Sequence, residues 1–178
     1  MPKKPTTEQL QRAVNRICKV IGQIPCFHIY EEYIANRIGT DEAERCLMAM
    51  THNAAMDSSL LNLRCFNEFF RPNSKRDDVR AHHFLGLSMR TFLTSEEERA
   101  INKYLAHLTI SGSEIAAKPW LLDDMTVRGL QHGIEFLSFI EARFSLHSDT
   151  DRDEVRGVRD AARLIVAKIA KREGEQVS

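Results

Sequence analysis

The stretch from residue 41 to Arg71 contains neither proline nor glycine, and this feature constrains the fold most. Asp41 with Glu44 three positions later is typical of a helix N-terminus, and Pro72 ends the stretch. A helix across it would be about 45 Å long at about 1.5 Å per residue, longer than a small domain is wide. The other segments must therefore pack along it. We expect its core face to be the apolar stripe of Leu47, Met50, Ala54, Leu61, Cys65 and Phe69.

Helix signals also precede this segment. Thr6 with Gln9 is a capping-box pattern, and it opens a helix whose apolar residues recur at helical spacing until Pro25. Residues 27–38 suit a shorter helix, which Gly39 would close as a C-terminal cap.

Three more helices are expected towards the C-terminus. Ser95 with Glu98 is another capping-box pattern and opens a helix of about 15 residues. Asp123 or Asp124 opens a longer helix, and the last begins near Thr150 with apolar residues at core spacing.

The sequence therefore predicts an all-α domain spanning residues 1–178, a helical bundle of about four main helices plus shorter helices. It divides into N-terminal helices (1–40), a central bundle (41–144) and a C-terminal helix (148–172). Residues 77–93 are expected to form a loop with one or two turns of helix.

Composition excludes several classes of function. The 25 basic and 25 acidic side chains cancel, so no overall field would draw the chain to nucleic acid or to an acidic membrane. The four cysteines form no C-x-x-C pair, which argues against a zinc knuckle and favours reduced, core-packed cysteines. No apolar run is long enough to span a bilayer, so we expect no membrane association and a cytoplasmic location.

The segment "RAINKYLAHLT" is the first candidate site. Arg99, Lys103 and His107 are spaced by four and would line one edge of a helix, with Asn102 beside them. Because the ordinary pKa of histidine lies near neutrality, His107 could transfer protons next to an anion held by the two cations. Arg64 on the long helix would face the same ligand. The alternative interpretation is a solvated helix edge.

Two further clusters carry weaker signals. Arg64 and Glu68 are four apart and could pair with each other. Asp78, His82 and His83 invite a metal site, but adjacent histidines on a helix point about 100° apart, so we predict no bound metal. Asp78 is expected to cap or hold this loop as a lid. The last helix alternates arginines with aspartates and is expected to neutralise itself.

The motifs "LRCFNEFF", "KRDDVRAHHF" and "INKYLAHLT", followed by Trp120, resemble a group of short bacterial all-helical proteins across about residues 45–140. More remotely, the layout resembles the HEPN superfamily of all-α domains. That resemblance implies a dimeric ribonuclease without metal, in which an arginine and a histidine from two subunits meet in a cleft.

The HEPN motif maps only partly onto this chain. His107 would be its histidine and Asn102 a polar companion, but Arg99 lies one residue too far back to be its arginine. Arg76, followed by Asp77 and then His82, is the secondary candidate.

Two functions stay open at this point, and with them whether the chain is an enzyme. One is a HEPN-like nucleotide- or RNA-binding protein, including a degenerate ribonuclease of a toxin or defence type, that acts as a homodimer without cofactor. The other is a helical protein-interaction module, antitoxin-like or structural, with no catalysis.

Overall fold

The first helix begins where the capping box predicts. In the computed structural model, which describes residues 4–35, 41–72, 79–84, 86–106, 122–146 and 148–176, α1 spans Thr7–Gln23. The Gln9 nitrogen donates to the Thr6 hydroxyl at 3.2 Å, and the Thr6 nitrogen donates to the Gln9 side chain at 2.8 Å. Both bonds satisfy amides that a helix end leaves without partners. The expected start of the helix is confirmed.

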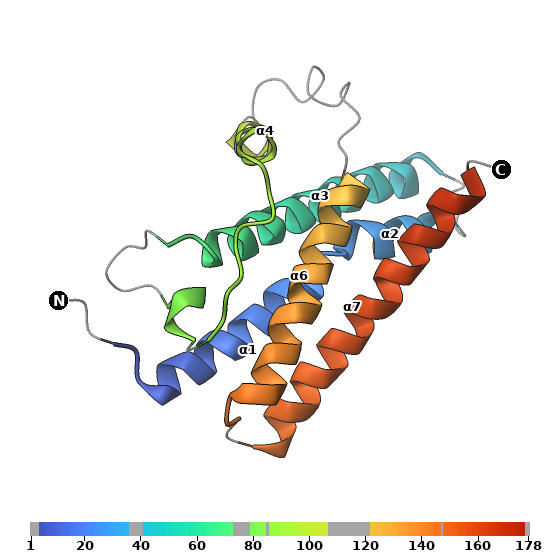
Figure 1. Ribbon diagram of the computed structural model, residues 1–178. Helices are drawn as coiled ribbons and strands as arrows, with labels where there is room; N and C mark the ends of the chain where they lie inside the picture. The colour runs from blue at the N-terminus through green and yellow to red at the C-terminus, as the bar shows by residue number, and fades with distance from the viewer. Residues whose placement is uncertain are drawn as a thin grey trace.

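The described residues contain helices and no strand, which confirms the all-α bundle. Five helices follow α1 (Figure 1), together with one 3-10 turn, η1. Their bounds are α2 Cys26–Ala35, α3 Glu42–Phe69, η1 Ala81–His83, α4 Ser95–Ala106, α6 Leu122–Arg143 and α7 Asp149–Gln176. No helix among these residues is long and apolar enough to cross a membrane.

The hydrophobic core lies where α1, the C-terminal half of α3, and α6 meet. Rings of Phe69 and Phe84 pack edge-on against Phe136, with centroids 5.3 and 5.6 Å away. Phe66 and Phe136 are fully buried. Helices α6 and α7 run side by side (Figure 1), and α7 buries Val155, Ala162 and Ile169. The core spacing expected for the last helix is confirmed.

The predicted core face of α3 is wrong. Its apolar stripe is exposed except for Phe69, and Leu47 and Met50 are 64% and 70% exposed. The buried face instead carries Leu60, Leu63, Phe66 and Phe69 with the polar Ser59, Asn62 and Asn67. These polar side chains find hydrogen-bond partners, as the 2.9 Å bond from the Phe27 nitrogen to the Ser59 hydroxyl shows. A polar residue with a partner can occupy a core position.

The N-terminal cap of α4 lies one residue earlier than predicted. The Thr94 nitrogen donates to the Glu97 carboxylate at 2.7 Å, and the Glu97 nitrogen donates to the Thr94 hydroxyl at 3.2 Å. Threonine is also among the preferred N-cap residues, and with Thr94 in this role Glu98 takes no part in the cap. Glu98 instead accepts hydrogen bonds from Asn67 and Arg71 of α3.

The arginines of α7 are neutralised, as expected. Arg152 pairs with Asp149 at 3.3 Å on the same helix. Arg156 and Arg159 both pair with Glu141 of α6, an interhelical partner that the sequence pattern did not indicate. The self-neutralising face therefore also holds α6 and α7 together.

The four cysteines are free, but only one is a core residue. Cys18 is buried, and burial raises the pKa of its thiol to about 12, so it stays protonated. Cys46 and Cys65 are exposed, which corrects the expectation of core-packed cysteines. Both lie on the outward side of α3, whose face was misassigned.

Candidate functional site

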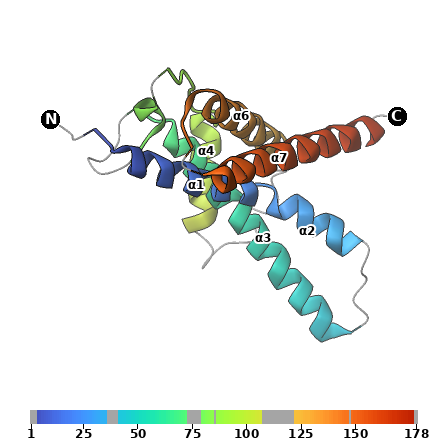
Figure 2. The same cartoon turned by 90° about the horizontal axis from the view of Figure 1, so that it is seen from below.

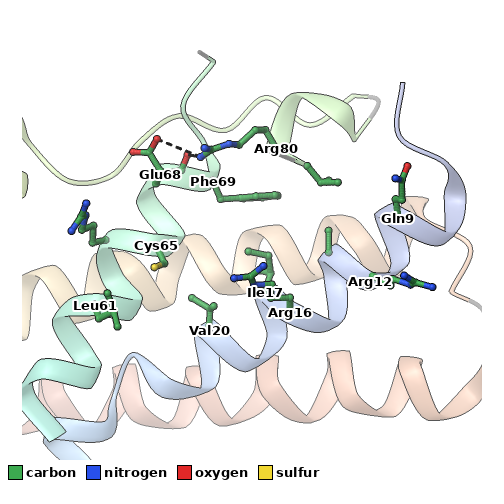
Figure 3. A pocket seen from close by; sticks show the side chains of 13 residues that line it. Gln9, Arg12, Arg16, Ile17, Val20, Leu61, Cys65, Glu68, Phe69 and Arg80 are labelled. Atoms are coloured by element: carbon green, nitrogen blue, oxygen red, sulfur yellow. Dashed lines mark hydrogen bonds and ion pairs between the residues drawn. The ribbon is translucent and has the colours of Figure 1, made fainter. Parts of the chain in front are cut away.

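A groove of about 700 Å³ lies between α1 and the C-terminal half of α3 (Figure 3). Residues 79–80, which lead into η1, also line it. Its lining residues are Gln9, Arg12, Ala13, Arg16, Ile17, Val20, Leu61, Arg64, Cys65, Glu68, Phe69, Val79 and Arg80.

The floor of the groove is apolar. Ile17 and Val20 of α1 face Leu61 and Cys65 of α3 across it (Figure 3). The α1 residues recur at intervals of three and four, so one side of that helix supplies its whole wall. An occupant with an apolar face would bury this floor from water, which is favourable at about 25 cal/mol per Å².

The walls are strongly basic. Four arginines line the groove: Arg12, Arg16, Arg64 and Arg80. Arg12 pairs with Glu8 at 2.5 Å, but both side chains are largely exposed, so this pair contributes little. Within the described parts of the chain, Arg16 and Arg64 form no ion pair or side-chain hydrogen bond. Two like charges in one groove repel each other, so an anionic occupant would be favoured.

Glu68 is the one acidic residue in the lining, and its carboxylate is paired with two arginines. It pairs with Arg71 at 3.2 Å and with Arg80 at 3.5 Å, and the Arg80 side chain also donates to the Glu68 backbone carbonyl. The expected pair between Arg64 and Glu68 is therefore not formed. The segment before η1 brings Arg80 to Glu68, which leaves Arg64 facing the groove.

A short turn fixes Arg80 in this position. The Arg80 backbone nitrogen donates to Nδ1 of His83 at 2.9 Å across η1. Burial lowers the pKa of His83, and the neighbouring His82 lowers it further. Both effects favour the neutral imidazole, which is the form that can accept this bond at Nδ1.

The predicted phosphate site on α4 is separate from the groove. Arg99, Asn102 and Lys103 are exposed, and none of them lines it. Arg64, which we expected to face the same ligand, lines the groove with Glu68 instead. The structure therefore does not join Arg64 to the α4 residues in this cavity.

Several other predicted residues cannot be placed. His107, Asp78 and Arg76 lie outside the described residues. His82 is exposed on η1, where its ring centroid lies 4.1 Å from that of His83. In the portions that the structure describes, no three histidine, cysteine or acidic side chains gather in a way that could hold a metal ion.

Sequence reasoning missed three of the four groove arginines. Arg12 and Arg16 are one turn apart beside the apolar stripe of α1, a signal that was available. Arg80 carried no such signal, because the fold of the loop before η1 brings it to Glu68. No protein-family model, curated protein or solved structure matches this chain, so the chemistry of the groove is what indicates a function.

Proposed function

We propose that the chain is a helical protein-interaction module whose groove binds an acidic amphipathic helix of a partner. The lining of the groove supports this proposal most directly. An apolar floor lies between two helices, and Arg16 and Arg64 stand at its edges with no acidic partner among the described residues. A helix with one apolar face and acidic flanks complements both features.

The size of the groove suits this occupant. One helical turn with its side chains, a cylinder about 10 Å wide and about 5.4 Å long, fills about 420 Å³. The cavity of about 700 Å³ therefore takes between one and two turns. Two turns present three or four anchoring side chains on one face, the number that helix-in-groove recognition uses.

The lining favours a helix over RNA. Arginines also bind phosphate, and this keeps the nucleotide- or RNA-binding interpretation as the competing one. Proteins that bind single strands add aromatic rings on which bases stack. Phe69 is the one aromatic residue in the lining, and it is only 5% exposed. A base would find no exposed ring in this groove.

The lining also provides no acid and base pair for catalysis. It holds no histidine or aspartate, and Glu68, its one carboxylate, is engaged by two arginines. General acid–base catalysis needs a group that can exchange a proton with the ligand. The groove is therefore suited to binding.

The test compares two labelled probes by fluorescence anisotropy at fixed ionic strength. One is a synthetic amphipathic helix of leucine and glutamate, and the other is a single-stranded RNA oligonucleotide. We expect the peptide to bind, and the Arg16→Ala/Arg64→Ala variant to bind it about tenfold more weakly. This corresponds to two exposed charge contacts of about 0.7 kcal/mol each.

The matched control is Arg152→Ala/Arg163→Ala, which removes two exposed arginines of α7 outside the groove. Its peptide affinity should equal that of the wild type. If the wild type binds the RNA but not the peptide, and the Arg16→Ala/Arg64→Ala variant loses this RNA binding, the nucleic-acid interpretation replaces this proposal. Binding of neither probe would overturn it.

A further inference from the structure

An apolar stripe runs along the exposed side of α3, with one gap at the polar Asp57 and Ser58. We call it the α3 stripe, and its members are Leu47, Met50, Ala54, Leu61 and Cys65. Their spacing of three, four and seven residues is that of a helix seam that packs against another helix. Leu47, Met50 and Leu61 are among the most exposed large hydrophobic residues of the described chain. Leu61 and Cys65 also line the groove, so the stripe leads into it.

The N-terminal half of α3 is free to reach another molecule. Figure 2 shows it running out away from α1 and α6, with α2 beside it. Helix α2 packs on the side opposite the stripe, where the Tyr30 hydroxyl donates to the Met48 carbonyl at 2.8 Å. Phe27 packs edge-on against His52 on the same side, with centroids 5.0 Å apart. The α3 stripe is thus left uncovered by α2.

We propose that the groove takes the N-terminal half of α3 from a second copy of this chain. The two α3 helices would run antiparallel about a two-fold axis, with each helix entering the other copy's groove. Met50 of one copy would lie opposite Leu61 of the other, and Leu47 opposite Cys65. Such an interface is self-complementary, as two-fold symmetry requires. This inference rests on the proposed function and names the partner of the same groove.

The charges favour the antiparallel arrangement. The start of α3 is acidic, with Asp41 as its N-cap and Glu42 and Glu44 within its first turn. Antiparallel pairing brings this turn to the end of the groove where Arg12 and Arg16 lie. Parallel pairing would instead place the acidic turns of both copies side by side, where like charges repel.

The area of contact predicts a weak dimer. Helix α3 has 28 residues and is about 42 Å long, so a contact strip about 10 Å wide covers about 420 Å² of each copy. Stable complexes bury about 800 Å² per partner, and the wall of α1 supplies only part of the difference. The dissociation constant should therefore lie in the micromolar range.

The first experiment measures the mass of the full chain by sedimentation from about 1 to about 100 µM, a range that brackets this constant. The wild type should shift from monomer to dimer, and Leu47→Glu and Met50→Glu should remain monomeric. These side chains are exposed, so the variants should keep the wild-type melting temperature at concentrations where the wild type is a monomer. Leu164→Glu is the matched control, because Leu164 is 68% exposed on α7, and it should still dimerise.

The second experiment tests the register. In a Cys46→Ser/Cys65→Ser background, Met50→Cys with Leu61→Cys should give a covalent dimer on mild oxidation. The two positions are 11 residues apart on one helix, about 16 Å, and cannot form a disulfide within one copy. The control pair is Met50→Cys with Leu164→Cys, whose second position lies on α7 outside the proposed interface. It should stay uncrosslinked.

A monomer throughout the concentration range, or a dimer that Met50→Glu leaves intact, would overturn the proposed dimer. The groove itself is then tested separately with the leucine–glutamate peptide on the Met50→Glu variant, because Met50 does not line the groove. Peptide binding without dimerisation would keep the interaction module and remove its self-partner. Loss of both would end both proposals.

Discussion

The side-chain oxygen of Asn67 lies 2.7 Å from the backbone nitrogen of Phe92 and accepts its hydrogen bond. The same oxygen accepts a bond from the Leu93 nitrogen at 2.9 Å, and the Asn67 amide group donates to Glu98. Asn67 is fully buried on α3. One side chain of the long helix thus holds both the segment before α4 and the first turn of α4.

Replacing Asn67 by alanine should lower the free energy of unfolding by about 2 to 4 kcal/mol. The change leaves the two amides of Phe92 and Leu93 without acceptors, and each such buried group costs about 1 to 3 kcal/mol. Urea denaturation measures the difference. Asn53→Ala is the control, since Asn53 is exposed on the same helix, and it should change stability by less than about 0.5 kcal/mol. If Asn67→Ala lowers the free energy of unfolding by much less than expected, solvent must reach the amides of Phe92 and Leu93 in the variant.

Two helical glycines should respond oppositely to alanine. A methyl group at Gly157 of α7 would meet nothing within 4 Å, so Gly157→Ala should stabilise the protein by about 0.5 to 1 kcal/mol through helix propensity. At Gly129 of α6 the same methyl would come within 2.6 Å of Leu63 and 3.3 Å of Phe92 in the core. Gly129→Ala should cost about 1 to 3 kcal/mol. Thermal melts of the two variants check the contrast.

Local signals predicted most of the helices because those signals lie within a few residues of each other. The bonds between Thr6 and Gln9 join neighbours, and so their pattern is visible in the sequence. The buried face of α3 was not predictable in this way. Asn67 looks like a surface residue until Phe92, 25 positions away, is brought to it. Meanwhile the exposed α3 stripe has the apolar spacing of a core face.

The groove was predicted only in part. Arg64 stood out as a basic residue beside apolar ones on the long helix. Its neighbours across the groove, Arg12 and Arg16, belong to α1, and their proximity arises from the packing of α1 on α3. Arg16 and Arg64 are 48 residues apart, so no local sequence pattern links them. The predicted phosphate site on α4 remains a prediction.

The α4 variants test that prediction apart from the groove. Arg99→Ala and Lys103→Ala should keep the melting temperature within a few degrees, because both side chains are exposed and form no ion pair with any described residue. They should also bind the acidic peptide as the wild type does, since neither lines the groove. Titration of an RNA oligonucleotide at controlled salt is the further measurement. RNA affinity that falls in these variants alone would support the site predicted around His107.

The last prediction concerns pH and His28 of α2, which is only 6% exposed. Burial lowers its pKa below the ordinary value of 6.5. Asp123, whose Oδ1 lies 3.7 Å from the His28 Nε2, acts in the opposite direction, as does Glu31, while Arg172 adds to the lowering. Burial dominates, so the folded protein holds His28 neutral.

The sign of the pH dependence follows from this lowered pKa. Between the folded pKa and 6.5, the unfolded chain binds the proton and the folded chain does not, so acid favours unfolding. The stability that neutral His28 provides is complete above about pH 6.5 and declines as the pH falls towards the folded pKa. We expect His28→Gln to flatten the decline measured by urea unfolding between about pH 7 and pH 5. His83→Gln should flatten it less, because His83 is only half-buried. An unchanged slope in His28→Gln would show that the pKa of His28 is the same in the folded and unfolded chain, and would contradict the prediction.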